Sequence, residues 1–191
     1  MQITLFGGSF NPPHIGHQIV IEQAFELMPD TDEMWLLPDY THNFPKHEKL
    51  IAPDHRLAMA RLLESDRVKT ETCVIEKKMS GNTIDHIEYL LQKYQGHNFS
   101  FLIGSDNLPT FNRWSRWEDL LDLIPFYIYP RAGHAMGPLQ KNMTPLLHPL
   151  QAMTNISSTL VRHRLENDLS VDFLLPPKVA GYIRANSLYQ T

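Results

Sequence analysis

The chain reads Gly7-Gly8-Ser9-Phe10-Asn11-Pro12-Pro13-His14-Ile15-Gly16-His17 directly after a short apolar run, Ile3 to Phe6. An apolar run that stops at two glycines predicts a buried strand followed by a tight turn. Apolar residues at helical spacing then predict a helix from about Ile15 to Leu27. A strand, a glycine turn and a helix in this order open a βαβ unit, so the stretch indicates an α/β fold with a mainly parallel sheet.

The same stretch has the features of a phosphate-binding loop. Gly7 and Gly8 let the backbone approach a ligand closely, and the start of the next helix offers unpaired N–H groups and a positive dipole end. His14 and His17 are three residues apart, so on a first helical turn they share one face and can hold one anion. Gly16 keeps that face free of a side chain. A glycine pair alone is more typical of an ordinary turn, but the full string favours a ligand site.

Short β-rich runs alternate with longer helical ones along the rest of the chain. Strands are expected at Met34–Leu37, Val68–Ile75, Phe99–Ile103 and Phe126–Tyr129, and helices at about Asp54–Ser65, Thr83–Gly96, Trp117–Leu123, Ser158–Asn167 and Pro177–Ala185. Residues 131–155 stay unassigned. The alternation predicts a Rossmann-like, doubly wound, mainly parallel sheet flanked by helices, whose ligands bind at the carboxyl ends of the strands. The loops after Phe6, Leu37 and Ile103 should therefore carry the chemistry.

Composition is that of an ordinary globular protein. The chain has 191 residues, 42% hydrophobic and 20% charged, so we expect a single domain over residues 1–191. The 17 basic and 21 acidic residues give a net charge of -4, which provides no general attraction to nucleic acid or to an anionic membrane. Cys73 is the only cysteine, which excludes an intrachain disulfide and a thiolate zinc site. No apolar run approaches the ~18 residues of a membrane span and no basic signal start is present, so we expect a soluble, cytoplasmic protein.

A second segment of interest reads Ile156-Ser157-Ser158-Thr159-Leu160-Val161-Arg162. Ser157 or Ser158 can cap a helix that begins here, which leaves N–H groups exposed at its start. Arg162 lies one turn further on and could bind a phosphate through its planar guanidinium. On its own, the segment is more typical of an ordinary capped helix with a solvated arginine.

These two segments resemble a known family. The first is similar to the G-G-x-F-x-P-x-H-x-G-H signature of the nucleotidylyltransferase superfamily, and more narrowly to the bacterial nicotinate/nicotinamide mononucleotide adenylyltransferases. The second matches the I-S-S-T-x-x-R motif of that family, which completes its triphosphate site with helices from about residue 156 onward. The resemblance implies catalytic roles for His14, His17 and Arg162. It implies ATP and phosphate contacts from the other motif residues, Gly7, Gly8, Ser9, Phe10, Gly16, Ile156, Ser157, Ser158 and Thr159.

The signature departs from the common pattern at two positions. Many members have Thr and Asp where this chain has Ser9 and Asn11. Ser9 keeps the hydroxyl, and Asn11 loses a charge but keeps a polar group. We therefore expect little effect on the site.

A third segment, Ile103 to Trp114, follows a strand and resembles the family's I-G-x-D-x-L-x-x-F-x-x-W stretch. Asp106 could accept hydrogen bonds from ribose hydroxyls, and Trp114 could stack on the cationic pyridine of a mononucleotide. In the family, the tryptophan stacks on the nicotinate ring, and Gly104 belongs to the same mononucleotide site. Trp117 is the nearby competitor for the stacking role.

Two weaker matches complete the resemblance. Ser80-Gly81-Asn82-Thr83 lies where the family has S-x-T, which holds the carboxylate or amide of the pyridine, so Asn82 and Thr83 are assigned to the mononucleotide. The family commonly has an aromatic residue at the place of Asn82, which leaves the preference between nicotinate and nicotinamide open. Lys46 and His47 lie near the family's P-P-H-K element; Lys46 is assigned to phosphate, although either residue could reach it.

The resemblance implies transfer of AMP from ATP to nicotinate or nicotinamide mononucleotide, with an NAD-type dinucleotide and pyrophosphate as products. Mg²⁺ would accompany ATP and be held mainly by phosphates and water rather than by a protein carboxylate cluster. A homo-oligomer is compatible with the sequence.

Three alternatives stay open. His14-Ile15-Gly16-His17 also spells a signature of class I aminoacyl-tRNA synthetases, and Lys78-Met79-Ser80 faintly resembles their second one, although the short chain and negative charge speak against a synthetase. A nucleotide sensor without turnover is a second alternative. A third is an enzyme of the same superfamily that acts on another acceptor, such as pantetheine phosphate or a choline-type phosphate.

Overall fold

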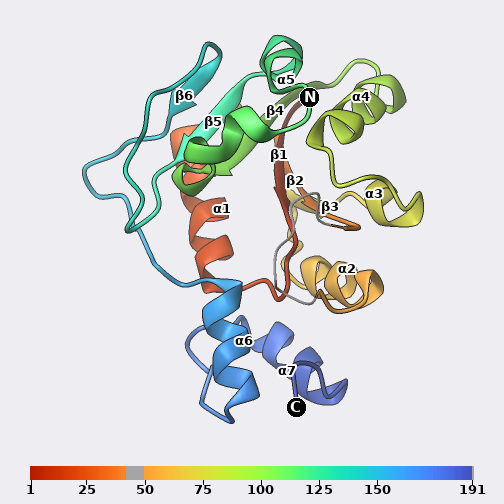
Figure 1. The fold of residues 1–191 in the computed structure, drawn as a ribbon, viewed down its shortest axis with the longest axis vertical. Coiled ribbons are helices and arrows are strands. Elements are labelled where there is room, and N and C mark those ends of the chain that lie inside the picture. The colour runs from red at the N-terminus through yellow and green to blue at the C-terminus, as the bar shows by residue number, and fades with distance from the viewer. Residues whose placement is uncertain (42–49, 191) are drawn as a thin grey trace.

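The computed structural model describes residues 1–41 and 50–190. The fold of these residues is built on a six-stranded sheet with the order β3-β2-β1-β4-β5-β6 (Figure 1). The described strand pairs are all parallel. The strands are β1 (Gln2–Gly8), β2 (Glu33–Pro38), β3 (Val68–Thr70), β4 (Asn98–Gly104), β5 (Phe126–Tyr129) and β6 (Met143–Pro145). The predicted Rossmann-like fold is confirmed.

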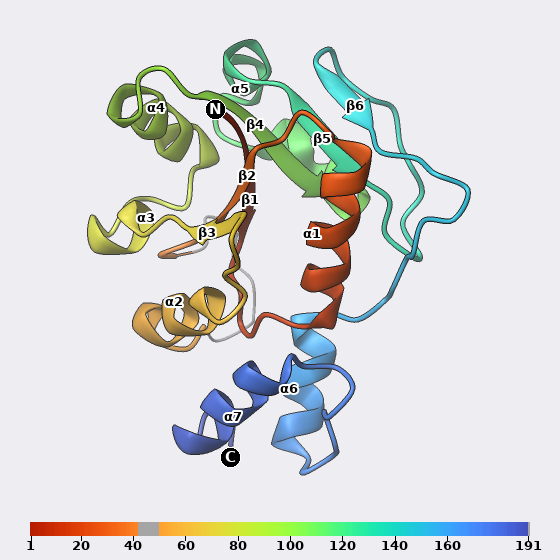
Figure 2. The same ribbon diagram turned by 180° about the vertical axis from the view of Figure 1, so that it is seen from behind.

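Helices cover both faces of this sheet (Figures 1 and 2). One hydrophobic core takes residues from α1 (Ile15–Leu27), α2 (Pro53–Arg61), α6 (Ser158–Glu166) and α7 (Pro177–Ala185). The other takes residues from α3 (Cys73–Glu76), α4 (Thr83–Lys93), α5 (Trp117–Leu123) and the 3-10 helix η1 (Ser105–Arg113). The strands serve both cores because successive side chains alternate between faces. In β4, Leu102 belongs to the first core, and Phe101 and Ile103 belong to the second.

The direction of winding changes between β1 and β4. From β1 the chain moves outward through β2 to β3, then returns to β4 on the other side of β1 and continues to β6. Loops that leave the carboxyl ends of two such strands diverge, and ligands bind in the crevice between them. Gly8 ends β1 and Gly104 ends β4. Two of the predicted functional loops therefore begin at this switch point.

The predicted strand Val68–Ile75 is wrong beyond Thr70. The strand stops there, and Cys73–Glu76 forms the short helix α3. The Glu71 carboxylate accepts hydrogen bonds from the Cys73 N–H at 2.8 Å and from the Tyr94 hydroxyl at 2.5 Å, which turns the chain away from the sheet. The β-branched residues favour a strand by propensity, and these contacts override it.

Other boundaries differ by smaller amounts. The N-cap of α2 is Ala52 rather than Asp54, and the helix ends at Arg61 rather than near Ser65. Thr83 is the first residue of α4, and Asn82 precedes it as the N-cap. Helix η1 was not predicted, and the unassigned stretch 131–155 contributes the edge strand β6. Neither element has a periodic apolar pattern long enough to be recognised in the sequence.

In the ranges 1–41 and 50–190, no helix is both long enough and apolar enough to cross a bilayer.

Candidate functional site

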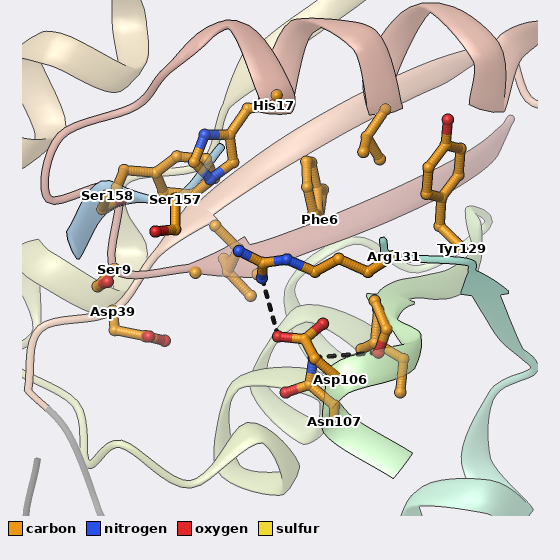
Figure 3. A pocket seen from close by; sticks show the side chains of 18 of the residues that line it. Phe6, Ser9, His17, Asp39, Asp106, Asn107, Tyr129, Arg131, Ser157 and Ser158 are labelled. Atoms are coloured by element: carbon orange, nitrogen blue, oxygen red, sulfur yellow. Dashed lines mark hydrogen bonds and ion pairs between the residues drawn. The ribbon is translucent and has the colours of Figure 1, made fainter. Parts of the chain in front are cut away.

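A cavity of about 780 Å³ opens at the carboxyl edge of the sheet (Figure 3). Every predicted site residue in the described part of the chain lines it, whereas Lys46 and His47 lie outside the described residues. The fold therefore gathers motifs that are up to about 150 residues apart in the sequence. The predicted residues that line the cavity are Gly7, Gly8, Ser9, Phe10, His14, Gly16, His17, Asn82, Thr83, Gly104, Asp106, Trp114, Ile156, Ser157, Ser158, Thr159 and Arg162.

His14 and His17 lie side by side at the start of α1, with their ring centroids 3.9 Å apart. His14 is the N-cap residue rather than part of the first turn, and its backbone N–H donates to Nδ1 of His17 at 3.1 Å. Because Nδ1 of His17 accepts this bond, the proton of the neutral ring is on Nε2. His17 can therefore donate its Nε2–H to a phosphate oxygen in the cavity.

The surroundings keep both histidines neutral. Burial, followed by the positive charge of Arg131, lowers the pKa of His17 to about 4. Burial also lowers the pKa of His14, and the neighbouring His17 and Arg131 lower it further. An anion placed among these groups would favour their charged forms, so phosphate binding should raise both pKa values.

Two glycines of the signature are required by close packing. A Cβ on Gly16 would lie 2.9 Å from the His14 ring, and a Cβ on Gly7 would lie 2.7 Å from the Phe101 ring. A Cβ on Gly8 would only make an ordinary contact, 3.7 Å from Phe10. Gly16 thus allows His14 to lie against the helix, a steric reason that adds to the open face expected from the sequence.

The start of α6 packs directly against the loop after β1. Ser157 is the N-cap residue, and its hydroxyl accepts the helix N–H three residues further on at 3.2 Å. The Ser158 hydroxyl donates to the Pro12 carbonyl at 2.8 Å. The buried guanidinium of Arg162 donates to the Asn11 carbonyl at 2.7 Å. Arg162 therefore joins α6 to this loop while it also lines the cavity.

The loop after β4 supplies the opposite end of the cavity. Asp106 Oδ2 accepts a hydrogen bond from Arg131 at 2.8 Å, and Oδ1 is buried and has no hydrogen-bond partner among residues 1–41 and 50–190. An unpaired carboxylate oxygen is a suitable acceptor for a ribose hydroxyl. Trp114 lines the cavity and rests on Phe111. Trp117 packs edge-to-face on the same ring. Within the described residues, Trp114 lines the cavity and Trp117 does not, so the geometry favours Trp114 for ring stacking.

The turn before α4 is ordered by its own side chains. The Ser80 hydroxyl accepts the Asn82 N–H at 3.1 Å, and the Asn82 amide donates to Asp85 at 3.2 Å. His86 is buried, and its Nε2 lies 2.6 Å from the Ser80 carbonyl. Since a carbonyl only accepts, Nε2 carries the proton. Asn82 and Thr83 line the cavity, and the hydrogen bonds of Ser80 with Asn82 and His86 hold the turn that carries them.

Sequence reasoning missed several residues of the cavity, of which Arg131 is the most important. Its side chain extends between His17 and Asp106 (Figure 3). Arg131 follows β5, so the rule that ligands bind at the carboxyl ends of strands could have found it if it had also been applied to this strand. Asp39, in the loop after β2, and His86 also line the cavity. In the part of the chain that the structure describes, no three His, Cys, Asp or Glu residues form a group that could hold a metal ion.

Comparison with known proteins shows which family the chain belongs to. Residues 5–164 match the family model described as cytidylyltransferase-like. The chain belongs to the cytidylyltransferase-like family. Within this family, it is 33% identical over 193 residues to a protein of Flavobacterium johnsoniae named "Probable nicotinate-nucleotide adenylyltransferase", with 100% of each chain covered. It is 30% identical to the nicotinate-nucleotide adenylyltransferase of Bacillus subtilis, with 100% of this chain and 99% of that protein covered. The resemblance read from the motifs is confirmed.

Solved structures of the family share the fold. The nicotinic acid mononucleotide adenylyltransferase of Plasmodium falciparum complexed with NaAD superposes on this chain with a TM-score of 0.80 at 20% identity. The superposition covers 98% of this chain and 97% of that one. The same enzyme complexed with APC gives a TM-score of 0.81. At 20% identity, this similarity shows a shared fold.

Proposed function

We propose that this protein transfers AMP from ATP to nicotinate mononucleotide, forming the dinucleotide and pyrophosphate for NAD biosynthesis. The observation that carries the proposal is the meeting of the start of α6 with the loop after β1 in one cavity, whose other end presents Asp106 and Trp114. Relatives named for this activity match the whole length of the chain at 30% and 33% identity.

In this reaction, the 5′-phosphate of the mononucleotide attacks the α-phosphorus of ATP. One P–O bond forms, and the bond from the α-phosphorus to the departing pyrophosphate breaks. The attacking oxygen is already anionic at neutral pH, so catalysis needs positioning and charge neutralisation rather than a strong base. We assign the Nε2–H of His17, together with His14, to the reacting phosphates. Arg162 and the N–H groups from Ser157 to Thr159 would hold the leaving pyrophosphate.

The mononucleotide would occupy the other end of the cavity. Trp114 would stack on the pyridine ring, since a cationic ring gains from an aromatic face. Asp106 Oδ1 would accept a ribose hydroxyl, and Asn82 with Thr83 would face the pyridine carboxylate. We assign Gly104 to the same subsite, where a Cβ would collide with Asp106. Lys46, outside the described residues, remains our candidate for a phosphate contact.

Enzymes of this family generally use a divalent metal together with ATP. We propose that the metal is Mg²⁺ and that it enters as part of the MgATP substrate. Mg²⁺ keeps several of its waters and binds phosphate oxygens, so it does not require a cage of protein carboxylates. When bound, it neutralises charge on the phosphates of ATP.

We also propose that residues 1–191 act as one domain, with the helices from about residue 156 completing the ATP site. The shared core of α1, α2, α6 and α7 supports this arrangement. We propose the cytoplasm as the setting of the reaction.

The proposal is tested by a side-by-side measurement of pyrophosphate release with ATP, Mg²⁺ and either nicotinate or nicotinamide mononucleotide. We expect turnover with nicotinate mononucleotide, and slower turnover with the amide. Pantetheine phosphate, choline phosphate and a mixture of amino acids serve as comparison acceptors. Release with one of these and with neither pyridine nucleotide would overturn the proposal, as would tight binding of the dinucleotide without any synthesis.

A further inference from the structure

Arg56, in the first turns of α2, is the largest side chain that the described fold buries completely, with an exposed fraction of 0%. Burying a guanidinium is costly unless its N–H groups find partners. A buried apolar side chain of similar volume would fill the same space without that cost. The need to fill the core therefore does not explain why an arginine is buried at this position.

The partners of Arg56 are backbone carbonyls from three separate segments. Nη1 donates to Ser9 at 3.0 Å and to Asp39 at 2.5 Å. Nη2 donates to Tyr40 at 2.9 Å, and Nε donates to Ile51 at 3.2 Å. One side chain thus joins the loop after β1, the loop after β2 and the segment before α2.

The contact with Ser9 orients the loop after β1. In a trans peptide the C=O of one residue and the N–H of the next point in opposite directions. The Ser9 carbonyl faces Arg56, and the Gly8 carbonyl accepts the Asp39 N–H at 3.0 Å. The N–H groups of Ser9 and Phe10 therefore point away from these partners, and both residues line the cavity. Ser9 and Asp39 lie near each other at the edge of the cavity in Figure 3.

We propose that Arg56 is a positioning residue for ATP. By holding the Ser9, Asp39 and Tyr40 carbonyls together, its guanidinium fixes the orientation in which the Gly8–Phe10 backbone offers N–H groups to phosphate. This inference rests on the proposed function, because it assumes that the loop after β1 binds the phosphates of ATP. It requires the forked geometry of the guanidinium, so a lysine at this place keeps the charge but not the effect.

Arg67 provides a matched control. Its guanidinium also donates to backbone carbonyls, those of Thr31 and Asp32, but at the opposite end of β2 from the cavity. Arg56→Lys and Arg67→Lys therefore remove the same kind of interaction at two places. Only Arg56 touches a loop that lines the cavity.

The test compares the steady-state kinetics and the Tm of these two variants with the wild type. We expect Arg56→Lys to raise the KM for ATP by about 10-fold or more, because a small displacement of phosphate donors is enough for such a loss. The KM for the mononucleotide should stay within about 2-fold, and Arg67→Lys should leave both KM values unchanged. A lower Tm with an unchanged KM for ATP in Arg56→Lys would show a merely structural role and overturn the inference.

Two further measurements keep the result decisive. Calorimetric titration with a non-hydrolysable ATP analogue should show the same loss of affinity in Arg56→Lys, even if the wild type proves inactive on pyridine mononucleotides. Failure of the proposed function is thereby separated from failure of this inference. If the variant does not fold, amide exchange in the wild type decides: the N–H groups of Ser9 and Phe10 should be protected by the analogue, and a lack of protection would refute the role.

Discussion

His17 receives both its tautomer and its charge from its immediate neighbours. The N–H of His14 occupies Nδ1, so the ring proton lies on Nε2, and burial with the nearby Arg131 keeps the ring neutral. A neutral ring still donates one hydrogen bond, and a phosphate that raises the pKa favours the protonated ring, whose charge-assisted hydrogen bond is stronger. These properties suit a group that stabilises charge as it develops on a phosphate.

Replacing His17 with alanine should lower turnover on the order of 10²–10³-fold, the usual loss when one donor to a developing oxyanion is removed. Pyrophosphate release under saturating substrates measures it. His163, which is exposed on α6, is the control, and His163→Ala should stay close to the wild type. Near-wild-type turnover of His17→Ala would show that His17 does not take part in the reaction.

The lowered pKa of His17 also predicts how stability depends on pH. The pKa is about 4 in the folded protein and about 6.5 in the unfolded chain, so between these values the unfolded chain binds more protons. Stability should therefore fall as the pH drops from about 7 toward about 4, by up to about 1.4 kcal/mol per pH unit. His14 and His86, whose pKa values are also lowered by burial, act in the same direction.

Urea unfolding at about pH 7, 6 and 5 measures this dependence. His17→Asn, which cannot titrate, should show a shallower slope than the wild type. Constant or rising stability on acidification would contradict the buried, neutral state of these histidines.

At the scale of elements, α1 and α7 each contain a glycine with a different purpose. A Cβ on Gly16 in α1 would meet the His14 ring at 2.9 Å, whereas a Cβ on Gly181 in α7 would meet no described atom within 4 Å. The first glycine makes room for the His14 ring, which we propose to act in the reaction, and the second only costs helix propensity.

The pair Gly16→Ala and Gly181→Ala tests this difference. Gly181→Ala should stabilise the protein by about 0.5–1 kcal/mol without changing turnover, because alanine is the better helix former. Gly16→Ala should destabilise it by about 1–3 kcal/mol, the usual cost of overpacking, and should lower turnover by displacing His14. Thermal unfolding and pyrophosphate release measure the two effects. A Gly16→Ala variant as stable and active as the wild type would show that His14 can move at no cost.

At the scale of the whole molecule, the C-terminal region shares its core with the sheet. Val161 in α6 and Val179 in α7 are buried in one cluster with residues of α1 and α2, and Leu175 lies in the same cluster with an exposed fraction of 1%. The Ile15 N–H also donates to the Leu174 carbonyl at 2.9 Å. The proposed ATP site therefore depends on packing that joins the N-terminal and C-terminal parts of the described fold.

Leu175→Ala should destabilise the entire protein by about 2–5 kcal/mol, the range for a leucine removed from a packed core. The loss should appear in the fluorescence of Trp35 on β2 as well as in far-UV circular dichroism, in one transition. Phe173→Ala, two residues away and 93% exposed, is the control and should change stability by less than about 0.5 kcal/mol. An unchanged Trp35 transition in Leu175→Ala would mean that the C-terminal helices unfold separately.

Features whose signals lie in neighbouring residues could be predicted from the amino-acid order. The first strand, the Ser157 cap and the two motifs are each written in a short stretch, because capping and apolar periodicity are local properties. The tight turn predicted at Gly7 and Gly8 is wrong, because both glycines belong to β1, where they pair with β2. The parallel, doubly wound sheet and the convergence of the loops after Phe6 and Ile103 followed from the alternation of strands and helices, and the meeting of the two motifs was implied by the resemblance to the family. The strand ending at Thr70 marks the limit of such signals, since Glu71 turns the chain by contacts with Cys73 and Tyr94.

Which polar groups are buried, and which atoms they face, became clear only from the three-dimensional fold. Arg131 and Arg56 follow no motif, yet one pairs with Asp106 in the cavity and the other is enclosed by carbonyls of three segments. Trp114 was favoured over Trp117 because its surroundings leave it on the cavity wall. The physical reason is that burial and pKa depend on atoms brought together from distant parts of the chain, which no local pattern of residues encodes.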